Sequence, residues 1–135
     1  MAVFLQFLVK STKYLTLGDR RSKMLMMYRT VKQIEEVKFI EDLSSDDAKK
    51  IENEILLIIR RGLAKLVIVL SELQSIGQTG LELLEKCAKL ARLRNGWLVL
   101  INPSQKIRTL VREKYSLSIF PIHFSSQSAI DAMCN

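Results

Sequence analysis

The sequence is poor in the residues from which most catalytic and metal sites are built. Its 135 residues include two cysteines, five glycines and one histidine. The cysteines and His123 form no C-x-x-C or H-x-x-x-H spacing, so we expect no metal site. The few glycines form neither a Walker A sequence nor G-x-G-x-x-G, so we expect no cofactor. The composition therefore favours a binding protein over an enzyme.

Long apolar runs are also missing. The run Leu66–Leu70 is far shorter than the roughly 20 residues of a membrane-spanning helix. Met1–Val9 is apolar but has no basic leader, so we expect no cleaved signal peptide. Two cysteines cannot form a disulfide framework, and Cys87 falls within an apolar helical pattern. We therefore expect reduced thiols and a cytoplasmic location.

Apolar residues make up 48% of the chain and charged residues 26%, the balance of a globular protein. The length suits one domain over residues 1–135. We expect this domain to be a monomer or a weak dimer. The net charge of +7 permits binding to nucleic acid, an anionic membrane or an acidic protein. Lys86, Lys89 and, less regularly, Arg92 share one helix face without interleaved aromatic residues. This pattern favours a solvated face or an acidic protein partner over nucleic acid.

The N-terminal region 1–36 reads as strands. Val3–Val9 and Met24–Val31 have strand composition, with turn residues at 17–20 between them. Val37–Ile40 predicts a further short strand. We expect the following helix to run to about Arg61, with Ser44 as its cap. Its apolar face carries four isoleucines: Ile51, Ile55, Ile58 and Ile59.

Within residues 43–133 helices and strands alternate. Leu66–Leu70 is apolar throughout, as a central strand covered on both faces would be. We expect a helix from Thr79 to Arg94 with Cys87 inward, followed by a strand Trp97–Ile101. The next helix is expected to be capped by Asn102, to have Pro103 as its first residue and to end near Tyr115. A strand near Ile119–His123 and a helix Ser125–Met133 complete the expected elements. Short connections of this kind predict parallel strands with right-handed crossovers.

Ligands of such sheets gather at the carboxyl ends of the strands, and the segment Ser71–Gly80 lies at one. Thr79 and Glu82 fit a capping box, in which the threonine hydroxyl bonds the third helical N–H. A hydroxyl at an exposed helix start is also well placed for phosphorylation, because the free N–H groups stabilise a dianion. One residue could serve both roles.

From Lys65 to Ala132 the chain resembles a STAS domain, the module of anti-sigma-factor antagonists and of sulfate-transporter tails. The family's apolar strand leads to an Asp-Ser-Ser-Gly-Leu or Asp-Ser-Thr-Gly-Leu type motif that opens a helix. The matching frame here is Leu66-Val67-Ile68-Val69-Leu70-Ser71-Glu72-Leu73-Gln74-Ser75-Ile76-Gly77-Gln78-Thr79-Gly80-Leu81. Gly96–Ser104 resembles the family's next strand with its Asn-Pro-Ser helix start, and Leu43–Ile59 is more weakly similar to its first helix.

The resemblance implies a STAS-like α/β fold: a mixed four- to five-stranded sheet flanked by about four helices. It also implies a non-enzymatic regulator that binds an anti-sigma factor or a histidine-kinase-like Ser/Thr kinase. By analogy Thr79 is the phosphate acceptor, and its phosphorylation weakens partner binding. The implied partner-binding residues are Ser75, Ile76, Gly77, Gln78, Thr79, Gly80, Leu81 and Leu84.

The sequence departs from the family at three positions. Gly77 replaces the motif aspartate, Gln78 replaces the first serine, and Val69 replaces a frequent acidic residue at the end of the strand. Docking through the loop and helix is therefore better supported than control by phosphorylation. An alternative role is an accessory subunit on the ATPase of an ABC lipid transporter. A third is an enzyme that uses His123 or Cys87, although no G-x-S-x-G elbow accompanies the histidine.

Overall fold

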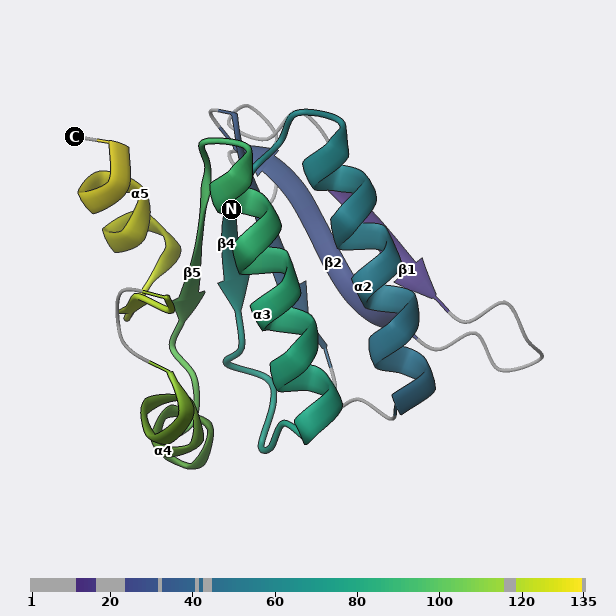
Figure 1. Ribbon diagram of the computed structural model, residues 1–135, viewed down its shortest axis with the longest axis vertical. Coiled ribbons are helices and arrows are strands. Elements are labelled where there is room, and N and C mark those ends of the chain that lie inside the picture. The colour runs from purple at the N-terminus through teal and green to yellow at the C-terminus, as the bar shows by residue number, and fades with distance from the viewer. Residues whose placement is uncertain are drawn as a thin grey trace.

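The computed structural model describes residues 12–16, 24–31, 33–40, 42, 45–115 and 119–134. One mixed sheet forms the centre, with its strands side by side in chain order (Figure 1). The strands are β1 (Thr12–Thr16), β2 (Met24–Val31), β3 (Ile34–Phe39), β4 (Lys65–Val69), β5 (Trp97–Ile101) and β6 (Ile122–His123). The helices are α2 (Ser45–Arg60), α3 (Gln78–Leu93), α4 (Gln105–Lys114) and α5 (Ser126–Cys134).

The pairing of the strands changes along the sheet. β1, β2 and β3 pair antiparallel, whereas β3, β4, β5 and β6 pair parallel. Parallel neighbours need crossover connections. α2 and α3 supply the β3–β4 and β4–β5 crossovers on one face of the sheet (Figure 1), and α4 lies in the connection from β5 to β6. The carboxyl ends of β3, β4 and β5 consequently meet at one edge. The predicted α/β fold with a mixed sheet and about four helices is confirmed, and the sheet has six strands among the described residues.

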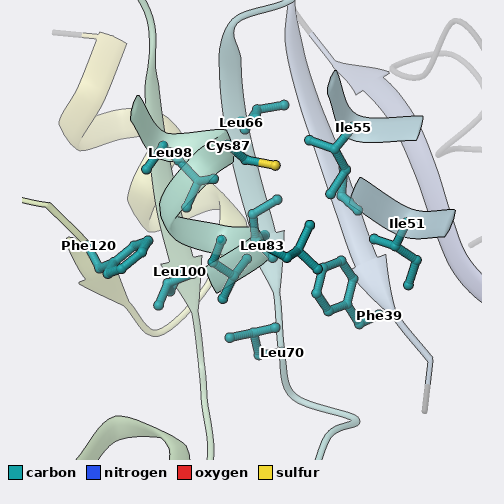
Figure 2. Close-up of a cluster of buried hydrophobic side chains, with 14 of the residues drawn as sticks. Phe39, Ile51, Ile55, Leu66, Leu70, Leu83, Cys87, Leu98, Leu100 and Phe120 are labelled. Carbon is teal, nitrogen blue, oxygen red and sulfur yellow. The ribbon is translucent and has the colours of Figure 1, made fainter. Parts of the chain in front are cut away.

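The main core lies between the sheet and the α2–α3 layer (Figure 2). Leu66, Ile68 and Leu70 point into it, together with the isoleucine face of α2 and with Cys87 of α3. Val67 and Val99 point to the opposite face, where they pack with Ala129 of α5. The prediction that Leu66–Leu70 is covered on both faces is therefore confirmed.

The N-terminal elements differ most from expectation. Met24–Val31 is the strand β2, as predicted, whereas the strand β1 was not predicted. Three predictions lie outside the described residues: the strand Val3–Val9, the turn at 17–20 and the cap Ser44. The short strand expected at Val37–Ile40 begins earlier, as β3. Val31 pairs with Ile34 across a tight hairpin in which Gln33 has φ 68°. Asn or Gly is the usual signal for such a turn, and the sequence has neither there.

The start of α4 also requires a correction. Asn102 and Pro103 were expected as its cap and first residue, but the helix begins at Gln105 with Ser104 as its N-cap. The Ser104 hydroxyl accepts a hydrogen bond from the backbone N–H of Ile107 at 3.2 Å. Asn102 instead has φ 49°, a left-handed conformation that asparagine tolerates better than most residues. It therefore turns the chain out of β5 before the helix begins.

Candidate partner-binding surface

The loop between β4 and α3, here called the β4–α3 loop (residues 70–77), lies at the edge where the parallel strands end (Figure 1). Its first residue, Leu70, is buried and donates its N–H to the carbonyl of Ile101. Leu73 is buried as well. The loop thus covers the end of the core with apolar side chains and leaves its polar residues outside.

Asp42, which follows β3, anchors this loop. Its Oδ1 accepts the backbone N–H of Gln74 at 2.9 Å and that of Ser75 at 3.4 Å. Its Oδ2 accepts the Ser75 hydroxyl at 3.2 Å. Hydrogen bonds to a carboxylate are among the stronger ones in proteins, so Asp42 fixes the backbone just before α3. The sequence analysis did not identify Asp42, because no local pattern connects it to residues more than thirty positions away.

Two further contacts hold the loop from other sides. The Ser104 hydroxyl, which caps α4, also lies 3.4 Å from the carbonyl oxygen of Gln74 and can donate to it. Lys38 of β3 forms an ion pair with Glu72 at 3.3 Å. Segments after β3, β4 and β5 therefore join at one place, as expected for the binding edge of a parallel sheet.

The start of α3 differs from the predicted capping box. Gly77 is the N-cap, and as glycine it has no side chain that could cap the helix. The carbonyl of Gly77 accepts the N–H of Leu81 at 3.0 Å, which places Thr79 inside the first turn. Glycine is well tolerated at an N-cap, so the helix can begin at Gln78, one residue before Thr79. The Glu82 carboxylate accepts a hydrogen bond from the Gln78 side chain at 3.2 Å.

The eight predicted partner-binding residues fall into an accessible group and a buried group. Gly77, Gln78 and Thr79 are exposed and Ser75 is half-buried, so these four can contact another protein. The other four are buried beneath them: Ile76, Gly80, Leu81 and Leu84. A Cβ added to Gly80 would lie 2.5 Å from Cγ1 of Ile76, so glycine lets the loop fold onto the helix. The buried residues shape the surface without forming it.

Thr79 borders a shallow groove of about 150 Å³ between α2 and α3, which Lys49, Glu52, Glu82 and Lys86 also line. Glu52 is buried and pairs with Lys49 at 3.2 Å and with Lys86 at 3.3 Å. Burial alone would raise the pKa of Glu52, but the two ammonium groups outweigh it and lower the pKa. The lysines therefore keep a negative charge in the groove and leave their own ammonium groups exposed beside Thr79.

Cys87 is unsuited to nucleophilic chemistry. Its side chain is buried in the main core (Figure 2). Burial, followed by the charge of Glu52, raises the pKa of the thiol to about 12. The reactive thiolate is consequently not populated near neutral pH.

We predict that native Cys87 resists thiol reagents. In a Cys134→Ser variant, where Cys87 is the remaining cysteine, Ellman's reagent at pH 8 should react only after denaturation. Adding Leu93→Cys, at a position 81% exposed, should give one rapidly reacting thiol as a matched control. Rapid reaction of the Cys134→Ser protein without denaturant would contradict the burial and would support a thiol enzyme.

His123, the other candidate for chemistry, lies half-buried in β6. Its Nδ1 is 3.4 Å from the Ser128 hydroxyl, at the limit of a hydrogen bond. Among the described residues no group of three His, Cys, Asp or Glu side chains is placed to hold a metal ion. Over the same residues, no helix has both the length and the apolar character needed to cross a membrane.

Residues 26–129 match the family model of the STAS domain. The chain therefore belongs to the STAS domain family, and the resemblance found in the sequence is confirmed. No curated protein sequence matches it.

Solved structures with the same fold include regulators and a transporter. A proposed anti-sigma factor antagonist from Thermotoga maritima has a TM-score of 0.76 and 18% identity, covering 80% of this chain and 93% of its own. The anti-sigma factor antagonist SpoIIAA, in its unphosphorylated form, has a TM-score of 0.67 and 16% identity, covering 82% and 98%. The murine anion transporter Slc26a9 has a TM-score of 0.60 and 11% identity, covering 99% of this chain and 24% of the transporter. Because the sequence identities are below 20%, the similarity to these structures establishes the fold of the chain and nothing further.

Proposed function

We propose that this chain is a non-enzymatic, cytoplasmic partner-switching regulator. It binds an anti-sigma factor, or a related histidine-kinase-like Ser/Thr kinase, through a surface formed by Ser75, Gly77, Gln78 and Thr79. The observation that carries the proposal is the exposure of Gly77, Gln78 and Thr79, next to the half-buried Ser75, on a backbone fixed by Asp42 at the carboxyl edge of a STAS-family sheet. Because the backbone is held before binding, little ordering entropy is lost in the complex.

The hydrogen bonds around the loop support this choice of surface. Gln78 donates to Glu82 and accepts from Lys114 of α4, so the exposed start of α3 is tied to α4. A partner that docks there meets side chains already held in position. Asp42 also supplies a carboxylate beside Ser75, in a surface where Gly77 lacks the family's motif acid.

Thr79 is the proposed phosphate acceptor. Its hydroxyl-bearing side chain is exposed in the first turn of a 16-residue helix, where N–H groups and the helix dipole favour an anion. Lys49 and Lys86 border the same groove and can approach a phosphate there. A dianion in the contact surface would bring charge that the partner must desolvate, so phosphorylation would release the partner. SpoIIAA of Bacillus, which shares the fold, has been solved in a phosphorylated form.

Co-purification tests the class of partner. Tagged protein expressed in its source cells should recover an ATPase of the histidine-kinase-like class, identified by mass spectrometry. A bait with Gln78→Arg should lose it, because the larger cation obstructs the exposed helix start, while Arg92→Gln at the far end of α3 should retain it. Recovery of an ABC-type ATPase instead would contradict the proposal and favour the accessory-subunit role.

A further inference from the structure

A second pocket lies away from the Thr79 surface, between α4 and β6. It has a volume of about 300 Å³, at the lower end of the range for small-molecule sites. Its lining residues are Arg108, Arg112, Pro121, Ile122, His123 and Phe124. Two guanidinium groups and an imidazole therefore face an apolar wall, and none of these described lining residues is a carboxylate.

Arg108 carries the strongest indication of a ligand. Its Nε is buried and has no hydrogen-bond partner among the residues that the structure describes. A buried, charged donor without an acceptor is unfavourable, and native proteins rarely leave one unsatisfied. Arg112 lies one helical turn further along α4, so two like charges share one face of the helix. Within the described residues neither arginine forms an ion pair.

Phe124 is the most exposed apolar residue that lines the pocket. Its side chain is 80% exposed, directly after β6 and beside the arginines. Pro121 and Ile122 line the same pocket with apolar atoms. An exposed ring of this size beside a cationic pocket is suited to pack against an apolar or planar group that enters with an anion.

We propose that this pocket binds a small organic anion, a phosphate monoester or carboxylate that carries an apolar group. Arg108 and Arg112 bind the oxygens of the anion, and Phe124 packs against the apolar part. Arginine is suited to this role because its planar fork offers two parallel donors to phosphate or carboxylate. The site is separate from Thr79 and makes no use of the proposed partner-binding surface.

The test uses phenyl phosphate and benzoate as probes, titrated into ¹⁵N-labelled full-length protein by NMR. Saturable binding of either probe should shift the Arg108 Nε–H and Phe124 amide signals, and the better probe identifies phosphate or carboxylate as the preferred anion. Inorganic phosphate and acetate, which lack the apolar group, should bind more weakly. Absence of saturable binding by both aromatic probes would overturn the proposal.

Variants on α4 separate a built site from general attraction to a basic protein. Arg108→Gln and Arg112→Gln should each weaken binding by about 10-fold or more, the usual loss for a hydrogen bond to a charged group. Lys106→Gln removes the same charge from an exposed position outside the pocket and should change affinity by less than about 2-fold. Arg112 is exposed, so its variant tests the site even where Arg108→Gln impairs folding. Equal weakening by Arg112→Gln and Lys106→Gln would contradict the proposal.

Discussion

Replacing Thr79 with glutamate should abolish partner binding, whereas Thr79→Ala should retain it. The glutamate places a fixed negative charge among the exposed residues Gly77, Gln78 and Thr79. A charge without a matching partner in an interface costs several kcal/mol, so we expect about 30-fold weaker binding or more. Alanine removes the hydroxyl without adding charge. Isothermal titration with the co-purified partner measures both affinities.

The fold should survive both changes, because Gly77 and not Thr79 caps α3. The free energy of unfolding of Thr79→Ala should therefore fall by less than about 1 kcal/mol. Thr109→Glu, on the exposed side of α4, is the matched control for an added charge and should bind normally. Equal affinity of the Thr79→Glu and Thr79→Ala proteins would contradict the switch.

Replacing Gly96 with alanine should destabilise the protein by about 3 kcal/mol or more, as overpacking against immovable atoms does. A Cβ at this position would lie 2.0 Å from the carbonyl oxygen of Ala64 and 2.5 Å from its carbonyl carbon. That oxygen accepts the N–H of Trp97 at 2.9 Å, where β4 and β5 begin to pair. The backbone cannot yield without loss of this pairing.

Gly77→Ala is the matched control, because an added Cβ there meets no atom within 4 Å. It should cost less than about 1 kcal/mol, the usual difference between glycine and alanine at an N-cap. Urea unfolding followed by circular dichroism gives both values. A Gly96→Ala protein as stable as Gly77→Ala would show that the β4–β5 start is less tightly packed than the structure indicates.

The parts of the fold with strong periodicity could be predicted from the sequence. The isoleucine face of α2 repeats with the period of a helix, and all four members are buried. Leu66–Leu70 is apolar on both faces and β-branched at its three central residues, as expected of central parallel strands. The helix expected at Thr79–Arg94 is α3 displaced by one residue. Burial of a whole face leaves a regular signal, which explains these successes.

Helix starts and long-range contacts could not be predicted in this way. Thr79 with Glu82 fits a capping box, yet the glycine before them caps the helix, since sequence spacing alone does not fix where the first turn closes. Asp42 reaches the β4–α3 loop through the folding of the sheet. Arg108 and His123 come together in the same way, from α4 and β6. Such juxtapositions depend on tertiary structure and have no local pattern.

Site-specific photo-crosslinking in the source cells tests the proposed surface most directly. A benzophenone amino acid would replace Gln78 at the start of α3 or Leu93 at its end, both of which are exposed. We predict that the Gln78 probe captures the histidine-kinase-like ATPase and that the Leu93 probe does not. Capture of the partner from Leu93 but not from Gln78 would contradict binding through the surface around Thr79.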